Sequence, residues 1–194
     1  MRSAKRETAT RSVWGRVAVL ICLLGFSVGC CQSAWAQPPR SILSAPIRQV
    51  QSFDCGPAAL ATLLSAHVAG PVGLTELTNA LMLSQAESVR AQTMGYSLQQ
   101  LVQMANSLGV DAHIAAVTHE ALTQLPLPVL VYLQLPTGPH FSVLSGVAGD
   151  RVLLADPSQG NLVWTREAFT RAWAPKGEGV LLSLQSLKSL PSLK

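Results

Sequence analysis

QVQSFDCGPAALATLL, residues 49–64, places a single cysteine, Cys55, where an irregular polar segment meets a run of small helix-forming residues. Asp54 is in the position of a helix N-cap, and Pro57 suits the first turn of the helix that follows. The apolar residues after it recur at helical spacing, which predicts a buried helix. A thiol at the start of that helix lies near the positive end of the helix dipole, which favours the thiolate, the nucleophilic form of the side chain.

The first 36 residues predict a signal peptide. A basic start precedes a largely apolar run, residues 17–28, and Ala34-Trp35-Ala36 has the small-x-small pattern of a cleavage site before Gln37. The apolar run is shorter than the roughly 20 residues that cross a bilayer. We therefore expect an exported, periplasmic protein that contacts the membrane only through this segment before cleavage. The alternatives are an uncleaved anchor, a lipid on Cys30, or full secretion.

Removal of this leader would change the charge of the chain. The chain has 14 Lys and Arg and 10 Asp and Glu, a net charge of +4. Five of the basic residues and one of the acidic residues precede residue 37, so nine of each remain. A formally neutral chain without a run of Lys or Arg gives no reason to expect nucleic-acid binding.

Removal of the leader would also leave Cys55 alone, because the other three cysteines precede residue 37. Exported proteins usually pair their cysteines. An unpaired thiol there is a liability unless it is buried or chemically useful. Free cysteine often packs as a small hydrophobic residue, so a structural and a catalytic Cys55 are both open at this point.

The remaining residues suit one domain with a hydrophobic core. Residues 37–45 predict an extended lead-in, 46–185 the folded domain and 186–194 a disordered tail. Helical patterns come first, and strand patterns come later, which predicts an α+β fold with a helical lobe and a mostly antiparallel sheet. The expected helices after the first are 74–83, 97–109, 118–122 and 165–173, and the expected strands are 111–117, 128–133, 140–147, 151–155, 161–164 and 179–184.

Residues 84–96 have little periodicity and predict a surface loop that lines a cleft. In contrast, Ser97 and Gln100 have the spacing of a capping box, which marks the start of the helix after this segment.

His140 and Asp156 are candidates for the partners of a cysteine nucleophile. A nucleophilic cysteine needs a base, usually histidine, and a third group that orients the base. His140 starts the strand 140–147, and Asp156 follows the strand 151–155. A hairpin of these strands brings the start of the first beside the end of the second, so the two residues become neighbours. The simpler alternatives are that His140 is a strand-edge histidine without a catalytic role and that Asp156 is an ordinary turn residue.

The other candidates are less specific. His67 lies about three helical turns after Cys55 and cannot return to it, while His113 and His119 are more simply surface or core residues. Gln49 has a side-chain amide that can donate to a developing oxyanion, together with the Cys55 backbone N–H. Gln51 is its rival, and spacing alone does not decide between them.

Three segments, QVQSFDCGPAALATLL, PHFSVLSG and ADPSQG, resemble in this order the motifs of the double-glycine leader peptidases. These are papain-like cysteine peptidase domains that trim bacteriocin and peptide-pheromone precursors. The resemblance covers most of residues 46–185, including NLVWTREAFTRAW. It implies a two-lobed papain-like fold, with Cys55 as nucleophile, His140 as general base and acid, Asp156 as orienting group and Gln49 as oxyanion donor. It implies no metal and no cofactor.

The best-known members of that family precede an exporter and an ATPase, and they act in the cytoplasm. An export signal without those parts leads us to expect a stand-alone relative with different substrates. We expect it to cleave a peptide or protein, such as a secreted precursor, with a secretion or surface-fibre system as a candidate partner. The alternatives are a non-catalytic peptide-binding or assembly module of such a system, and amide or acyl transfer on a non-protein substrate.

Overall fold

The computed structural model describes residues 43, 45–68 and 70–184. The predicted signal peptide, most of the predicted lead-in and the predicted tail at 186–194 lie outside the described residues. The elements are, in chain order, α1 (Cys55–His67), α2 (Leu74–Ala80), α3 (Gln85–Met94), α4 (Leu98–Ser107), β1 (His113–Thr118), the 3-10 helix η1 (His119–Gln124), β2 (Val129–Leu135), β3 (Gly138–Ala148), β4 (Arg151–Asp156), β5 (Gly160–Thr165), α5 (Arg166–Trp173) and β6 (Glu178–Ser183). Within these ranges no helix has the length and apolar character that a membrane crossing requires.

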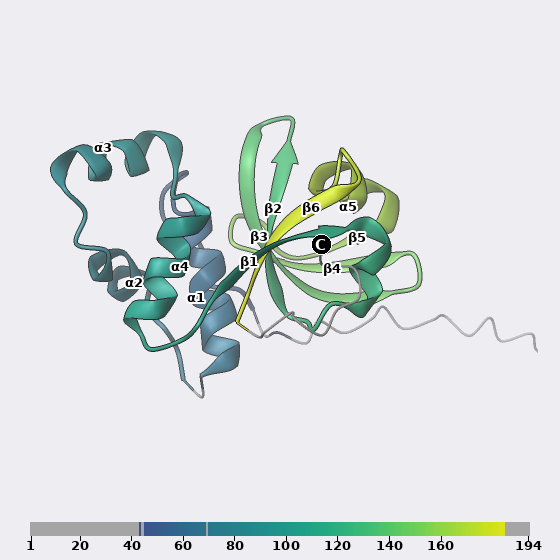
Figure 1. The fold of residues 1–194 in the computed structure, drawn as a ribbon, viewed down its shortest axis with the longest axis horizontal. Coiled ribbons are helices and arrows are strands. Elements are labelled where there is room, and N and C mark those ends of the chain that lie inside the picture. The colour runs from purple at the N-terminus through teal and green to yellow at the C-terminus, as the bar shows by residue number, and fades with distance from the viewer. Residues whose placement is uncertain (1–42, 44, 69, 185–194) are drawn as a thin grey trace, which may run out of the picture. The chain divides into compact units, whose positions relative to one another are not determined.

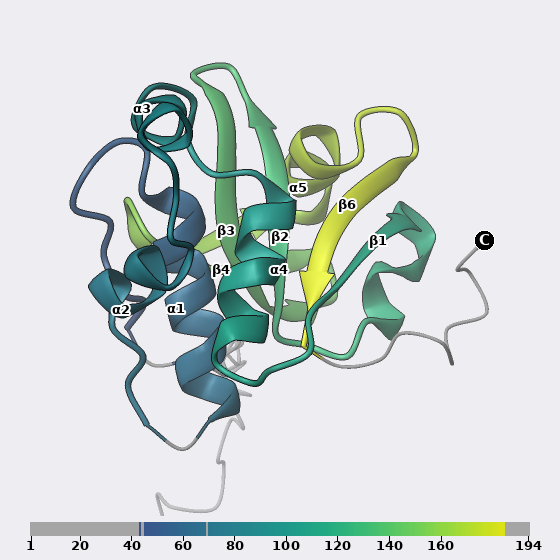
Figure 2. The ribbon, with the colours of Figure 1, turned by 60° about the vertical axis from the view of Figure 1, so that its left-hand side comes forward.

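The six strands form one sheet in the order β1-β6-β2-β3-β4-β5, and every neighbouring pair is antiparallel. Helices α1 to α4 gather on one side of the molecule, while the sheet and α5 lie on the other (Figure 1). The same grouping persists when the molecule is turned (Figure 2). The predicted α+β fold, with helices first and an antiparallel sheet after them, is confirmed.

The two faces of the sheet pack on different helices because strand side chains alternate between faces. On β2, Leu130 belongs to the cluster that contains α1 and α4, whereas its neighbours Val129 and Val131 belong to the cluster that contains α5. The helix with the cysteine is therefore held between other helices and the sheet.

Helix α1 is buried over its first ten residues, Cys55 to Leu64, without a polar face. Small residues permit this close packing. A Cβ on Gly56 would lie 3.1 Å from Phe141 of β3 and 3.3 Å from Leu101 of α4. Glycine at this position thus brings the start of α1, and with it Cys55, directly against β3.

The segment predicted as a loop at 84–96 is instead largely helical, and this prediction was wrong. Helix α3 buries only Ala91, so it lacks the apolar stripe that periodicity detects. Its start is fixed locally by a capping box, in which Ser84 accepts from the Glu87 backbone N–H and the Glu87 side chain accepts from that of Ser84. The hydrogen bonds to Ser84 hold the pKa of Glu87 below its ordinary value.

Two other details differ from the sequence pattern. Asp54 occupies the N-cap position of α1, but its side chain makes no capping bond. Its Oδ2 instead accepts from the backbone N–H of Gln51 at 3.1 Å, which closes the loop before the cysteine. Helix α2 ends at Ala80 rather than near residue 83, and Met82 just after it has a φ of 46°.

Candidate active site

His140 and Asp156 are in direct contact, as the predicted hairpin required. The Nε2 of His140 lies 2.8 Å from Oδ2 of Asp156, and the side chains are only 14% and 3% exposed. Strands β3 and β4 pair antiparallel, which brings the start of one beside the end of the other. The contact at Nε2 leaves the second ring nitrogen, Nδ1, available to another group.

The second oxygen of Asp156 is held by the turn that follows β4. Its Oδ1 accepts from the Ser158 backbone N–H at 2.9 Å, the Ser158 hydroxyl at 2.7 Å and the Gln159 backbone N–H at 3.0 Å. Burial raises the pKa of Asp156, but hydrogen bonds from His140 and Ser158 outweigh it and hold the pKa below its ordinary value. The side chain is therefore a fixed carboxylate.

The His140 imidazole is stabilised in its charged form. Burial lowers its pKa, but hydrogen bonding and charge attraction from Asp156 and Cys55 raise it to about 9. An imidazolium at neutral pH is the form that can donate a proton to a leaving group.

Cys55 is the first residue of α1, a free cysteine that is 8% exposed. Its side chain lies close enough to the His140 imidazole to raise the pKa of that ring, so the start of α1 and β3 bring the two groups together. Together, α1, β3 and β4 bring a thiol, an imidazole and a carboxylate into one group, in which the imidazole contacts the carboxylate and responds to the thiol.

A cavity of about 500 Å³ opens beside Cys55. Its walls are Ser52 and Phe53 before α1, several residues of 92–99 at the junction of α3 and α4, and Tyr132 and Phe141 of the sheet. The rings of Tyr132 and Phe141 lie 5.2 Å apart. Although 84–96 is mostly helix rather than loop, its end does line the cavity, as the sequence predicted for this segment.

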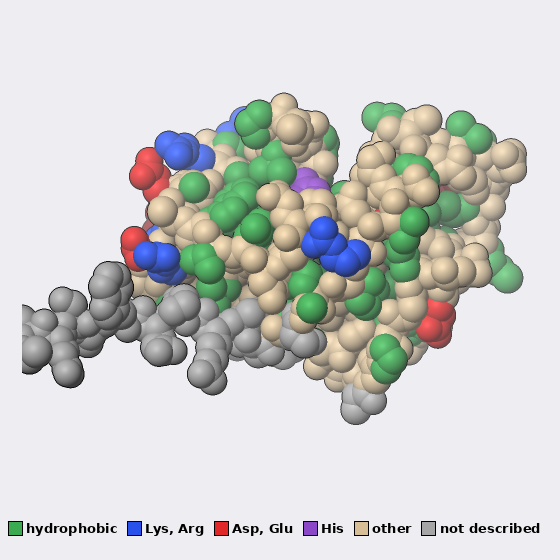
Figure 3. Space-filling view, turned by 180° about the vertical axis from the view of Figure 1, so that it is seen from behind, with side chains coloured by type: hydrophobic (Ala, Val, Ile, Leu, Met, Phe, Trp, Pro, Cys, Tyr) green, Lys and Arg blue, Asp and Glu red, His purple; other side chains and the backbone are tan. Residues whose placement is uncertain are grey.

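The surface near the cavity is uneven. The space-filling view shows a hollow with histidine surface at its base and few charged side chains around it (Figure 3).

Tyr96 at the junction of α3 and α4 contributes a phenol to the cavity. Burial, assisted by the negative charge of Asp54, raises the pKa of Tyr96, so the phenol remains a neutral hydrogen-bond donor.

Gln49 and Gln51 belong to one hydrogen-bonded loop before α1. The Gln49 Nε2 donates to the Gln51 carbonyl at 3.1 Å, and the Gln49 backbone N–H donates to the Pro157 carbonyl at 3.1 Å. The Gln49 Oε1 is buried without a hydrogen-bond partner among the described residues. The Gln51 side chain, in contrast, is exposed.

The remaining histidines lie apart from this group. His67 ends α1, about 18 Å from Cys55 along the helix. His113 is an exposed residue of the edge strand β1, and His119 contacts Glu120 at 3.1 Å on the surface.

Sequence reasoning missed two residues that support the site, Ser158 and Arg48. Ser158 was visible only as part of the turn after Asp156, where serine is common. Arg48, which donates to the Ser158 carbonyl, is separated from it by 110 residues and gives no local signal.

A model of the Peptidase C39 family matches residues 44–187. The probable functional amyloid protease FapD of Pseudomonas aeruginosa is 28% identical over 127 residues, which are 66% of this chain and 56% of FapD. FapD of Pseudomonas fluorescens is 29% identical over 138 residues, 69% of this chain and 61% of that protein. The chain thus spans little more than half the length of these curated relatives.

A solved double glycine motif protease from an AMS/PCAT transporter, in complex with the leader peptide, has a TM-score of 0.59 to this structure. It is 23% identical, and the match covers 74% of this chain and 92% of that one. The fold is that of the papain-like cysteine peptidases, as the sequence motifs predicted. The chain belongs to the Peptidase C39 family.

Proposed function

We propose that this chain is an exported cysteine peptidase that cleaves a peptide bond with Cys55, His140 and Asp156. The observation that supports this most is the buried contact of the His140 imidazole with the Asp156 carboxylate, beside a thiol near enough to raise the pKa of the same ring. Two further observations support these roles: Cys55 borders a cavity, and Asp156 is buried and contacts the His140 ring.

The reaction begins with the Cys55 thiolate and the His140 imidazolium. The sulfur attacks the substrate carbonyl carbon, and the carbonyl oxygen becomes an oxyanion. His140 donates its proton to the leaving amine as the C–N bond breaks, which leaves a thioester on Cys55. Neutral His140 then takes a proton from a water that attacks the thioester, and the carboxylic product leaves as the thiolate and imidazolium are restored. Asp156 orients the ring and stabilises its charge throughout.

Gln49 is the proposed side-chain donor to the oxyanion. An amide nitrogen has two hydrogens, and the bond to the Gln51 carbonyl uses one of them, so the other is free for the substrate. The loop also fixes Gln49 through both its backbone and its side chain, whereas the exposed Gln51 side chain has no hydrogen bond to the described residues.

We expect Gln49→Ala to lower kcat by roughly 10² to 10³ with a smaller change in KM, the usual loss for one oxyanion donor. Gln51→Ala is the matched control, because it keeps the backbone carbonyl that Gln49 binds, and it should retain activity. Steady-state kinetics on a cleaved peptide measure both. A larger loss in Gln51→Ala would assign the donor to Gln51, and equal losses would contradict a donor role specific to Gln49.

The proposed substrate is a peptide or protein segment that enters the cavity in an extended form. Phe53, Tyr132 and Phe141 offer apolar and aromatic surface, and the Tyr96 phenol offers a hydrogen-bond donor. The similarity to FapD suggests a secreted substrate, such as a component or precursor of a surface fibre, with the corresponding secretion system as partner.

Digestion of a peptide library, read by mass spectrometry, tests the peptidase proposal directly. Wild type should produce new termini that Cys55→Ala does not produce. If wild type cleaves nothing, and Cys55→Ala supports the native role in cells as well as wild type does, a non-catalytic binding or assembly module replaces the peptidase.

Export is proposed from the first 36 residues, and we expect the mature protein to begin at or near Gln37. The measurement is the intact mass of the protein recovered from the periplasm of an expressing cell. A mass that includes the apolar segment would indicate a retained anchor, and an added lipid mass would assign Cys30 as the anchor.

A further inference from the structure

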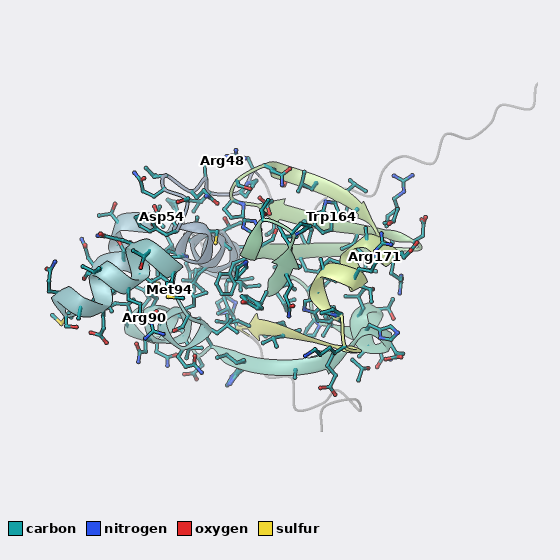
Figure 4. The ribbon with its side chains drawn as sticks, turned by 90° about the horizontal axis from the view of Figure 1, so that it is seen from above. Arg48, Asp54, Arg90, Met94, Trp164 and Arg171 are labelled. Atoms are coloured by element: carbon teal, nitrogen blue, oxygen red, sulfur yellow. The ribbon has the colours of Figure 1, made fainter. Side chains whose placement is uncertain are left out.

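The chain segment that enters α1 is bonded to the turn between β4 and β5. The Gln49 backbone N–H donates to the Pro157 carbonyl at 3.1 Å. The Arg48 guanidinium donates to the carbonyl of the next residue, Ser158. Figure 4 shows Arg48 where the segment leading to α1 meets the strands. Two successive peptide units of the turn are thus held by two successive residues before the cysteine.

Ser158 connects this contact to the Asp156 carboxylate. Its carbonyl accepts from Arg48, while its backbone N–H and its hydroxyl both donate to Asp156 Oδ1, at 2.9 and 2.7 Å. These bonds fix Oδ1 on the side of the turn. Because the two carboxylate oxygens are rigidly linked, the same bonds aim Oδ2 at His140.

The surroundings of Arg48 fit this contact. Gly160 has a φ of +90°, and a Cβ on it would lie 3.3 Å from Nη1 of Arg48. Glycine therefore permits both the conformation of the turn and the close approach of the guanidinium. Among the described residues, the ion pairs do not include Arg48, so its contact is with the turn carbonyl rather than with a carboxylate.

We propose that Ser158 and Arg48 are positioning residues for the site, an inference that rests on the proposed peptidase function. Ser158 holds the Asp156 carboxylate in the orientation that faces His140, and Arg48 holds Ser158. Since Gln49 belongs to the same segment as Arg48, one element fixes both the orienting acid and the proposed oxyanion donor.

The experiment compares Ser158→Ala, Ser158→Thr and Arg48→Ala with wild type. The readouts are kcat and KM on a cleaved peptide and the titration of the His140 imidazole by NMR. The groups whose charge acts on this imidazole are Asp156 and Cys55. We expect kcat of Ser158→Ala to fall about tenfold, as for loss of a hydrogen bond to a charged group. KM should change little, because neither residue lines the cavity.

The midpoint of the His140 titration should move down from about 9 in Ser158→Ala. A less firmly held carboxylate stabilises the imidazolium less. Ser158→Thr keeps the hydroxyl and should restore both the midpoint and kcat. Arg48→Ala should change both in the same direction as Ser158→Ala.

Two matched controls lie at the other end of β4, about 20 Å away. Arg166 donates to the Gly149 carbonyl at 3.2 and 2.6 Å, a contact of the same kind as that of Arg48. Thr165 uses its hydroxyl to cap α5, accepting from Ala168 at 3.2 Å. Arg166→Ala and Thr165→Ala should lower the melting temperature and leave the His140 titration unchanged.

A double-mutant cycle identifies the route of the effect. If Arg48 acts through the acid, Arg48→Ala should lower kcat much less in an Asp156→Asn background than in wild type. Fully additive losses would overturn this route. A lower melting temperature with unchanged kcat and unchanged His140 titration would overturn the proposal by making Ser158 and Arg48 structural only. The NMR titration needs no substrate, so a shifted midpoint supports the positioning role even if wild type cleaves no peptide and the peptidase proposal fails.

Discussion

Cys55→Ala and His140→Ala should each lower peptide cleavage by roughly 10⁶, to the background of the assay. Without the Cys55 sulfur there is no thioester and thus no covalent route. Without the His140 imidazole the leaving amine receives no proton, and the thiolate loses the cation that stabilises it. Because the members of such a group act as a unit, the double variant should be no less active than either single variant.

The folded state must be checked beside the kinetics. Cys55→Ala replaces a small buried side chain and should melt close to wild type, whereas His140→Ala leaves the buried Asp156 without its cationic partner and should melt lower. His67→Ala and His119→Ala are the matched controls, since these residues lie outside the site, and both should cleave normally.

The rate of Cys55 alkylation as a function of pH provides a readout that needs no peptide. We expect Cys55 to react faster than a model thiol near neutral pH in wild type, because the helix dipole and His140 both favour the thiolate. The rate should fall in His140→Ala. A Cys55 that reacts in wild type only as a model thiol does, and no faster than in His140→Ala, would indicate a structural cysteine.

The sequence predicted those parts of the site that depend on local patterns. The start of α1 at Cys55 followed from small residues at helical spacing, and the contact between His140 and Asp156 followed from one short hairpin. Helix caps are local as well, and the predicted capping box of Ser97 and Gln100 is present.

The features that the sequence did not predict depend on tertiary contacts or have a weak pattern. Helix α3 is mostly exposed, so its hydrophobic pattern is faint, and only its capping box marks it. The Asp54 side chain accepts from the Gln51 backbone N–H in the loop rather than from an N–H of the first turn of α1. Both donors are close to Asp54 in sequence, so residue spacing does not predict which one it binds. The bond from Arg48 to Ser158 joins segments that come together only when the helical part and the sheet pack.

Asp156→Asn should retain weak activity, with kcat lower by roughly 10³ to 10⁴, the range for the orienting acid of such a group. The reason is specific to this turn. The backbone N–H groups of Ser158 and Gln159 require an acceptor at the Oδ1 position, so the asparagine oxygen must stay there. The asparagine NH₂ then faces Nε2 of His140 as a second donor, and the imidazolium loses its acceptor. We therefore expect Asp156→Asn to be no more active than Asp156→Ala.

The pH dependence of stability gives a second measurement on Asp156→Asn. In wild type the folded-state pKa of His140, about 9, exceeds its ordinary value of 6.5. Between these two pH values the folded protein therefore holds a proton on His140 that the unfolded chain releases. The charged imidazole thus stabilises the folded state fully below pH 6.5, and this contribution to the free energy of unfolding is lost as the pH rises through about 9. The melting temperature of wild type should fall across this window. In Asp156→Asn the largest favourable contribution to the imidazolium is absent, so the melting temperature should fall less over this pH range. The decrease of kcat on the alkaline side of its pH profile should also occur at lower pH. If the melting temperatures of the two proteins fall equally between pH 6.5 and 9, Asp156 does not stabilise the charged imidazole.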